Sequence, residues 1–558
     1  MAASPILKFA NAKSARPKPK LGLRAWMERV LVECDRAALG FDADPVHDLR
    51  VALRRCRSLA DGLMALDPDP SWKDMKKAGK KLFQALGELR DMQVMQEWIE
   101  KLSDPSDPVA IKLLDHVRAR EVEYKQRAFK DLNQFDRKQW RQWTRTLPRR
   151  ASRVRPGSAV HLHLALEKWT AAYDLHKHAL RSRSQAGWHE LRIGIKRFRY
   201  TVENFLPRQH ALWGDDLKDL QDLLGEVHDL DVLWAMAVEA DVNAFPDIEH
   251  RNRWREKLNA ERTRRIDLYR RKMVGRQPLW RVWRVGLPLG PQLRAAAMSR
   301  LKVWAGYLDP DFPHSQRVAQ LALLLYDGLK DAGLLAMNTE TQEAGQQEFD
   351  RPKVVPPNPV HSSPAPPHLA PLDRDYDARA VLQAAAFLHD VGKAKGPENH
   401  QKNSYRMIRA LPRPLGWSAR ELELTAVVAR YHRGALPHPR GKTMLLLDLP
   451  DRPIAMELAG VLRLANALDS HHARNGRSGK EKESESANQP RLEVSVQDRF
   501  VLVRAAGYSA LDRAAEGVAA ARHLLETVLH RPVVVRALRA SAERGKSAGH
   551  VSSSTRTL

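Results

Sequence analysis

The sequence lacks features that secreted, membrane and thiolate-metal proteins need. It has only 2 cysteines in 558 residues, which excludes a disulfide framework and a cysteine metal site, and favours a reducing compartment. It has no apolar run of the roughly 18 residues that a membrane span requires, and its opening residues lack a signal-peptide core. We therefore expect a cytoplasmic protein without a membrane partner.

Acidic and aromatic residues are also scarce. The chain has 67 aspartates and glutamates against 93 lysines and arginines, giving a formal net charge of +26, which favours an anionic partner. Aromatic residues make up 6%, and no zinc-finger, basic-zipper or RNA-recognition pattern occurs, which argues against base-specific nucleic-acid recognition. Non-specific nucleic-acid binding stays open as an alternative.

Most of the chain is predicted to be helical. Apolar residues recur every three or four positions from about residue 21 to 337, with turns at 67–70 and 104–108. Residues 492–496 alternate as a strand that can pair with 500–503 in a small β-hairpin. We predict these segments in order: a disordered basic tail (1–20), a first domain (21–300) of two repeats (21–150 and 160–300), a second domain (301–337 and 374–536), a disordered proline-rich insertion (338–373), and a disordered tail (537–558).

A basic histidine helix occurs twice in the predicted first domain. On a helix, offsets 0, +3, +7 and +10 lie on one face, so each copy presents one histidine and three cations as a stripe. Like charges in such a row repel by a few tenths of a kcal/mol per pair, so an anionic ligand would offset their cost. The plain alternative is a solvated charged face. The two stripes are His47, Arg50, Arg54 and Arg57, and His189, Arg192, Lys196 and Arg199.

A second motif follows each stripe in the same order. Residues 86–94 read LGELRDMQV, and residues 224–232 read LGEVHDLDV. Two spaced motifs that recur together are hard to explain by chance, so we interpret them as an internal repeat.

The doubled pattern resembles the CHAD domain, a conserved-histidine helical domain. Its elements are H-x-L-R-x-x-x-[KR]-R-x-R, a lysine-bearing helix, and L-G-x-x-[RH]-D-x-x-V, and the resemblance covers about residues 20–300. It implies two pseudo-symmetric helical bundles that bind inorganic polyphosphate. The second repeat departs from the first at His228, where the first has Arg90. The implied ligands are both stripes with Arg55 and Arg197 beside them, and, as weaker candidates, Lys76, Lys77, Lys80, Lys81 and Lys218.

A second group of chemically competent residues lies in the predicted second domain. His389 and Asp390 are adjacent at the end of an apolar helix, His314 opens an earlier helix, and Asp469 closes a later one. Imidazoles and carboxylates from separate helices can hold one divalent cation, for which Mg, Mn, Fe and Zn are the candidates. Buried histidines that only bridge helices are the plain alternative.

The order H…HD…D resembles the HD metal-dependent phosphohydrolase superfamily. The longer run from residue 389 to 535 looks like the HD-type helical domain of exopolyphosphatase and guanosine-pentaphosphate phosphohydrolase proteins. The resemblance implies metal ligation by His314, His389, Asp390 and Asp469, catalytic roles for Lys393 and His432, and phosphate or outer contacts from His400 and Arg430. Asn403 departs from the pattern, as do the long segment between His314 and His389 and the lack of a glycine-rich phosphate loop. The resemblance thus implies phosphate affinity more firmly than turnover.

Together these patterns predict a mostly α protein that joins two pseudo-symmetric helical bundles to a helical HD-type domain with a small β-hairpin. The expected function is binding of inorganic polyphosphate, free or in granules, beside a metal-binding domain that binds or hydrolyses phosphate compounds. Three questions stay open: whether the protein is a metal-dependent phosphohydrolase of polyphosphate or guanosine polyphosphates, whether it binds nucleic acid non-specifically, and whether it forms a homodimer.

Overall fold

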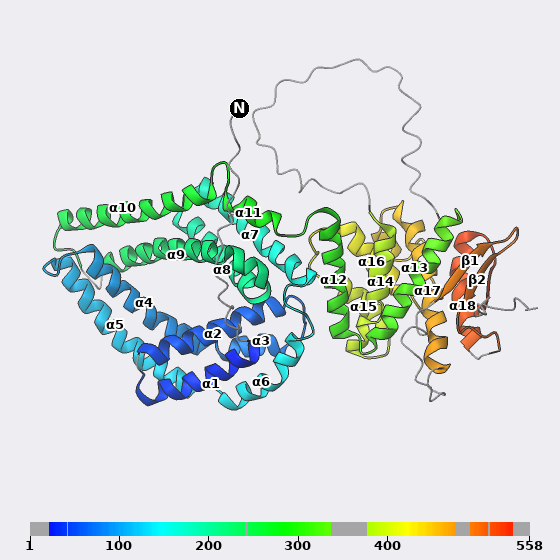
Figure 1. The fold of residues 1–558 in the computed structure, drawn as a ribbon, viewed down its shortest axis with the longest axis horizontal. Coiled ribbons are helices and arrows are strands. Elements are labelled where there is room, and N and C mark those ends of the chain that lie inside the picture. The colour runs from blue at the N-terminus through cyan, green and yellow to red at the C-terminus, as the bar shows by residue number, and fades with distance from the viewer. Residues whose placement is uncertain are drawn as a thin grey trace, which may run out of the picture. The chain divides into compact units, whose positions relative to one another are not determined.

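The computed structural model describes residues 22–41, 43–239, 244–335, 376–475, 491–511 and 514–538. The chain divides into two compact units, one ending at Pro288 and one beginning at Leu289. Most described residues are helical, as predicted, with a small sheet near the end of the second unit (Figure 1).

The first unit is built of helices that fall into two sets. Turns separate α2 from α3 and α4 from α5 at the positions predicted, and the Asp107 side chain accepts a hydrogen bond from Val109 N to cap α5. The first set is α1 (Leu23–Gly40), α2 (Ala43–Leu63), α3 (Ser71–Ala78), α4 (Lys80–Leu102), α5 (Pro108–Asn133) and α6 (Arg137–Ala151). The second is α7 (Ala159–Ser182), α8 (Gln185–Phe205), α9 (Pro207–Ala237), α10 (Ile248–Met273) and α11 (Leu279–Val285).

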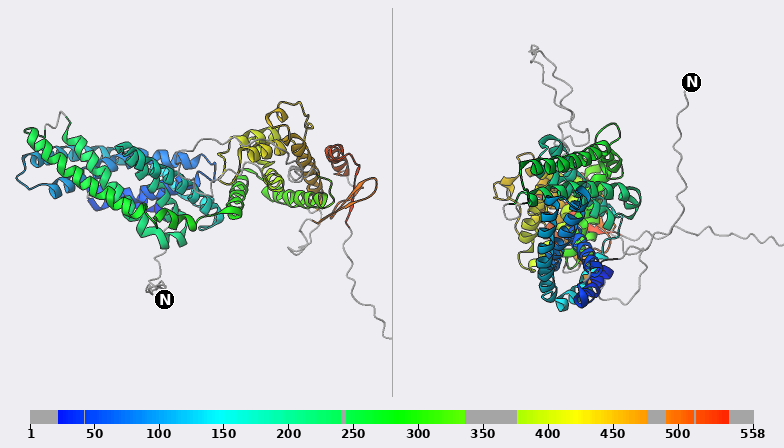
Figure 2. Two further views of the ribbon diagram at one scale, coloured as in Figure 1. Left: turned by 90° about the horizontal axis from the view of Figure 1, so that it is seen from above. Right: turned by 90° about the vertical axis from the view of Figure 1, so that its left-hand side faces the viewer.

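The two sets pack in the same order. Helix α1 contacts α2 and α6, and α7 correspondingly contacts α8 and α11. Helix α4 packs against α2 and α5, and α9 packs against α8 and α10, which lies beside it in both Figure 1 and Figure 2. Equivalent helices also meet each other, α2 with α8 and α4 with α9. This is the arrangement of two repeats related by a pseudo-two-fold axis.

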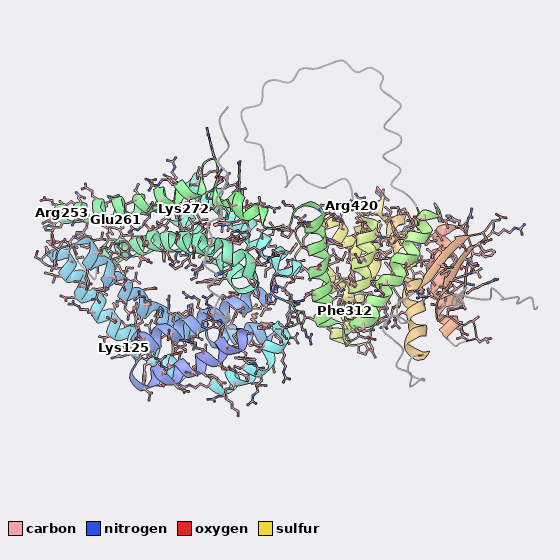
Figure 3. The ribbon with its side chains drawn as sticks, in the orientation of Figure 1. Lys125, Arg253, Glu261, Lys272, Phe312 and Arg420 are labelled. Carbon is pink, nitrogen blue, oxygen red and sulfur yellow. The ribbon has the colours of Figure 1, made fainter. Side chains whose placement is uncertain are left out.

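Tryptophans form much of the core of these bundles, as expected from their spacing. Trp72 and Trp140 in the first repeat and Trp254 and Trp283 in the second are fully buried. Charged residues cover the remaining surface of the helices, for example Arg253, Glu261 and Lys272 along α10 in Figure 3. A solvated charged face therefore exists in this unit, and the stripes have to be distinguished from it by their surroundings.

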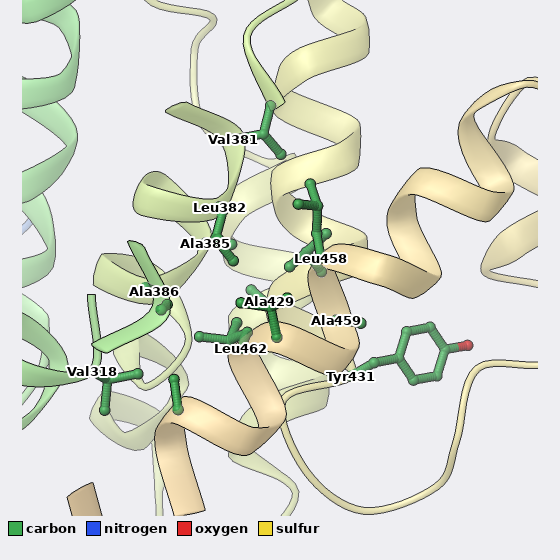
Figure 4. Close-up of a cluster of buried hydrophobic side chains, with 14 of the residues drawn as sticks. Val318, Val381, Leu382, Ala385, Ala386, Ala429, Tyr431, Leu458, Ala459 and Leu462 are labelled. Carbon is green, nitrogen blue, oxygen red and sulfur yellow. The ribbon is translucent and has the colours of Figure 1, made fainter. Parts of the chain in front are cut away.

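The second unit packs its helices around one apolar core. Side chains from α13, α14, α16 and α17 converge there, including Val318, Leu382, Ala429 and Leu462 (Figure 4). Helix α12 packs against α14 and so lies with this unit, although residue 301 was the predicted start of the domain. Its helices are α12 (Gly290–Leu308), α13 (Phe312–Asp331), α14 (Ala378–Leu388), η2 (Val391–Lys395), α15 (His400–Arg409), α16 (Ala419–Arg430), η3 (Met444–Leu446), α17 (Asp451–Asn475) and α18 (Ala514–Leu529).

A three-stranded sheet completes the second unit. Strands β1 (Leu492–Val496) and β2 (Val501–Ala505) form the predicted antiparallel hairpin, with Val494 opposite Val503. Strand β3 (Val533–Ala537) pairs with β2 in parallel after the crossover helix α18. We did not predict β3, because a short apolar run after a helix does not show that it returns to a distant strand.

Several predicted segments lie outside the described residues. These are the tail over 1–20, the whole proline-rich insertion over 338–373, and the final tail beyond residue 538. Among the residues that are described, no helix combines the length and the apolar character needed to cross a membrane.

Candidate functional site

The two basic stripes meet at one cleft of about 430 Å³ in the first unit. Arg50 and Arg54 reach it from α2, and Arg192 and Lys196 reach it from α8. Because α2 packs against α8, residues about 140 positions apart in the chain face the same space. The structure thus brings together the central residues of both predicted stripes.

Among the described residues, no ion-pair partner is found for Arg50, Arg54, Arg192 or Lys196, the stripe residues that line the cleft. In addition, Nε of Arg50 and Nε of Arg54 are buried without a hydrogen-bond partner. A buried donor without an acceptor costs about 1–3 kcal/mol. An anion in the cleft would supply acceptors for these donors.

Burial and the neighbouring cations together lower the pKa values of two of the cleft cations. Burial, with the neighbouring Arg192 and Arg50, lowers the pKa of Lys196 to about 8. Burial also lowers the pKa of Arg50, and Arg54 adds to the effect. These cations are therefore held close together at a cost that a polyanion would relieve.

Aromatic rings support the stripes, a feature that sequence reasoning missed. The Tyr200 ring centroid lies 6.0 Å from both Arg54 Cζ and Lys196 Nζ. The Phe83 ring lies 6.0 Å from Arg50 Cζ and 5.1 Å from Arg57 Cζ. Cations over ring faces keep defined positions. Tyr200 follows the second stripe by one residue, which is the signal that could have identified it.

Two other predicted arginines turn away from the cleft. Arg57 donates to the Lys76 carbonyl oxygen at 2.6 Å. Arg55 forms an ion pair with Glu203 at 2.6 Å and lines a separate hollow of about 660 Å³. Both side chains are thus engaged within the protein.

The outer candidates do not line the cleft either. Lys218 is exposed and pairs with Asp222 at 2.9 Å. His189 Nδ1 lies 3.3 Å from His228 Nδ1, so the residue that departs from the first repeat contacts the second stripe's histidine. Arg199 lies with its Cζ 5.8 Å from the Tyr200 ring. Five further candidates are also exposed: His47, Lys77, Lys80, Lys81 and Arg197.

The second unit holds a cluster of histidines around one aspartate. Ligand atoms of His314, His389 and Asp390 lie within 4.8 Å of one another, and so do those of Asp390, His400 and His432. Each of these residues lies at a helix end: the start of α13, the end of α14 and start of η2, the start of α15, and the end of α16. Asp390 is shared between the two sets.

Backbone carbonyls fix the tautomer of three of these histidines. His389 Nδ1 donates to Ala386 O at 2.7 Å, and His400 Nδ1 donates to Pro397 O at 2.8 Å. His432 Nδ1 likewise donates to Ala429 O at 2.9 Å. A carbonyl oxygen can only accept, so Nδ1 carries the proton and Nε2 presents a lone pair.

These lone pairs converge on Asp390. His400 Nε2 lies 3.1 Å from Asp390 Oδ1 and 3.3 Å from His432 Nε2, and His389 Nε2 lies 3.4 Å from Asp390 Oδ2. His389 Nε2 is buried and has no hydrogen-bond partner. Lone pairs and a carboxylate at these distances repel one another unless a cation lies among them. The donor set therefore fits a divalent metal ion.

The electrostatics of the cluster agree with this fit. Burial lowers the pKa of His432 well below its usual range, so the ring is neutral and its lone pair is available. Lys393 Nζ donates to Asp390 Oδ2, which favours the ionised carboxylate. The aspartate is thus held as a carboxylate.

Asp469 has a different place from the one predicted. Its two oxygens accept hydrogen bonds from Arg317 Nε at 2.8 Å and Arg317 Nη2 at 2.9 Å, and Oδ2 also accepts from His314 Nδ1 at 2.6 Å. His314 Nε2 lies 3.0 Å from Asn466 Oδ1 and 3.9 Å from Asp390 Oδ2. Burial lowers the pKa of His314, but the contact with Asp469 outweighs burial and raises it. Asp469 therefore contacts His314. His400, expected as a phosphate or outer contact, and His432, expected as catalytic, place their Nε2 atoms beside Asp390 Oδ1.

Comparison with known proteins agrees with both resemblances. Residues 23–238 match the family model of the CHAD domain, and residues 369–512 match that of the Ppx/GppA phosphatase, domain III. A crystal structure of the CHAD domain from the plant Ricinus communis is 21% identical, covers 47% of this chain and 88% of its own, and aligns with a TM-score of 0.32. No curated protein matches the chain.

Proposed function

We propose that the first unit binds inorganic polyphosphate in the cleft between α2 and α8. The observation that carries this proposal is the convergence of Arg50, Arg54, Arg192 and Lys196 on one cleft without carboxylate partners among the described residues. Arginine forks and a lysine ammonium group match the oxygens of a phosphate chain, which needs no base readout. Successive phosphates would contact the two stripes in turn.

The aromatic rings of the cleft favour a phosphate chain over nucleic acid. Trp98 lines the cleft, but Lys101 Nζ and Arg265 Cζ each lie 4.7 Å from its ring centroid. Arg54 and Lys196 likewise lie near the Tyr200 ring. Bases bind proteins by stacking on free ring faces, which these cations occupy. Nucleic acid binding would thus rest on charge alone.

The test compares two double variants with the same change in charge. Arg50→Glu with Arg192→Glu reverses one cleft cation in each repeat, and we expect it to weaken binding of long-chain polyphosphate by at least about 100-fold. Lys125→Glu with Arg253→Glu reverses two exposed cations outside the cleft (Figure 3) and should cost far less. Equal losses in the two variants, or equal affinity of the native protein for duplex DNA, would show that net charge explains the binding.

In the second unit, we propose that the cluster binds a divalent cation. His389, His400, His432 and Asp390 would hold it, with His314 on the far side of Asp390. The imidazole-rich donor set favours Zn, Fe or Mn over Mg. A bound cation of this kind polarises phosphoryl oxygens and lowers the pKa of water. Metal analysis of the purified protein tests the proposal.

A second candidate function is hydrolysis of phosphate compounds at this centre. The buried His389 Nε2 without a partner favours it, because buried groups with unmet bonding capacity cluster at reactive sites. In such a reaction Lys393 would contact the phosphate, Asp469 would keep His314 oriented, and the apolar wall would exclude bulk water. Incubation of the metal-loaded protein with polyphosphate and with guanosine polyphosphates, followed by phosphate release, decides it. Metal binding without phosphate release would mean that the cluster binds a metal ion but does not hydrolyse these compounds.

A further inference from the structure

The cleft also contains carboxylates, and most of them are paired. Glu97 pairs with Arg90 at 3.2 Å, and Asp222 pairs with Lys218 at 2.9 Å. Glu226 pairs with Arg265. Asp229, which lines the cleft, and Asp91, which is close enough to interact with Arg50 and Arg192, differ, because neither forms a hydrogen bond or an ion pair with another described residue. Two carboxylates thus lie near the cleft cations without pairing directly with any of them.

Asp91 and Asp229 occupy equivalent positions in the two repeats. Each follows the variable residue of the LGEx[RH]D motif, and the helices that carry them, α4 and α9, pack against each other. The negative charge of Asp91 raises the pKa of Asp229. The pseudo-symmetry that joins the basic stripes therefore also brings two like charges together.

The surroundings of Asp229 hold charges of both signs. From α8, Arg192 favours its ionised form, and from α4, Asp91 opposes ionisation while Arg90 favours it. On α9 itself, Glu226 opposes ionisation. Arg50 from α2 and Arg192 and Lys196 from α8 favour the ionised form of Asp91. Burial prevails over these cations and raises the pKa of Asp229 to about 6.

We infer that the carboxylate pair makes polyphosphate binding proton-linked: Asp229 takes up one proton from solvent when the chain enters the cleft and releases it when the chain leaves. This inference rests on the proposed function of the cleft. A polyanion next to the ionised pair would add a third negative charge to it. The protonated carboxyl instead donates a hydrogen bond to a phosphate oxygen.

The sign of the effect follows from linkage. In the free protein Asp229 titrates near pH 6, and a bound anion raises its pKa further. Below pH 6 Asp229 is protonated in both the free and the bound protein, so its contribution to affinity is greatest there and does not change with pH. Above pH 6 binding needs a proton, and affinity falls by up to about tenfold for each unit by which binding raises the pKa.

Neighbouring titratable groups affect the polyphosphate affinity in different pH ranges. Burial, with Arg192, lowers the pKa of His228 to about 4. The pH range in which His228 affects the affinity therefore begins near pH 4. Lys196, with a pKa of about 8, begins to contribute only above pH 8. The interval from pH 6 to 7.5 is therefore where replacing Asp229 has its clearest effect.

The experiment measures the affinity of the full-length protein for long-chain polyphosphate from pH 5.5 to 8. Internal phosphates of a long chain do not titrate in this range. We expect the native protein to lose about tenfold in affinity from pH 6 to 7.5, and Asp229→Asn to remove that loss and bind more tightly at pH 7.5. Asp91→Asn should shift the loss to lower pH. Calorimetry in two buffers of different ionisation heat counts the proton directly.

The control is Asp219→Asn, a change of the same charge on α9 at a residue that pairs with Lys272 at 3.0 Å. It should keep the native pH profile. A pH-independent affinity in the native protein, or an unchanged profile in Asp229→Asn, would overturn the inference while the cleft stays a polyphosphate site. Absence of polyphosphate binding at every pH would overturn both.

Discussion

The cleft of the first unit and the histidine cluster of the second, which we propose as a metal centre, gather opposite kinds of chemical group. The cleft gathers cations along the middle of two helices, and the Nε atoms of Arg50 and Arg54 have no hydrogen-bond partner. The histidine cluster gathers lone pairs and a carboxylate at helix ends, and His389 Nε2 has no hydrogen-bond partner. Both arrangements would be unfavourable without a ligand, and each specifies the sign of the ligand that it needs.

The two sites also differ in their exposure to solvent. The cleft is open, with half-buried cations that a long chain could reach from outside. In the metal centre His389 is completely buried, and Asp390, His400 and His432 nearly so. Electrostatic interactions there are weakly screened, whereas those in the cleft depend on salt. The predictions below test this contrast, beginning with the largest effect.

Removing the central carboxylate should break the metal centre alone. We expect Asp390→Ala to lower affinity for a divalent cation by at least about 100-fold, because the two sets of donor atoms share this residue. Polyphosphate affinity of the same variant should stay at the native value. Asp327→Ala, which breaks an exposed pair with Arg379 in the same unit, is the matched control. Full metal occupancy in Asp390→Ala would refute the assignment.

A smaller effect is expected at the residue that orients His314. Asp469→Asn keeps the shape of the side chain but weakens its contacts with His314 Nδ1 and Arg317, so metal affinity should fall by about tenfold. Cobalt substitution offers a spectroscopic readout of ligand geometry, which a purely structural role would not change. An unaltered cobalt spectrum together with native affinity would show that Asp469 does not position the ligand.

The smallest predicted effect is a change in salt dependence at the cleft. Each cation that contacts phosphate contributes about 0.7 to the slope of log affinity against log salt for a single-stranded polyanion. Arg54→Gln and Lys196→Gln should each reduce the slope by about that amount, and Lys125→Gln should leave it unchanged. Metal affinity should show little salt dependence in all three. A slope unaffected by both cleft variants would place the phosphate contacts elsewhere.

The cleft was the more predictable of the two sites. Helical periodicity placed Arg50 and Arg54 on one face of the first copy and Arg192 and Lys196 on the corresponding face of the second. That the two faces meet follows from the packing of α2 against α8. Periodicity gives the direction in which a residue leaves its helix, but not what its side chain contacts. Arg57 lies on the predicted face, yet it reaches the Lys76 carbonyl. Arg55 lies beside that face and pairs with Glu203.

The metal centre was less predictable because its ligands lie at helix ends. Adjacent His389 and Asp390 marked the place, but the positions of His400 and His432 depend on how loops return to the core. Asp469 was expected as a ligand from its place in the motif, and its engagement by Arg317 arises from helix packing that no local pattern encodes. The same limitation applies to β3, whose partner strand is separated from it by a helix.

The contact of equivalent helices across the first unit has a consequence for ligand direction. Because α2 meets α8 and α4 meets α9, the cleft presents similar groups when it is entered from either end. A linear polyphosphate is identical when read forward or backward, whereas a nucleic acid strand has distinct ends. If the cleft binds polyphosphate as proposed, the chain would therefore bind equally well in either of two orientations.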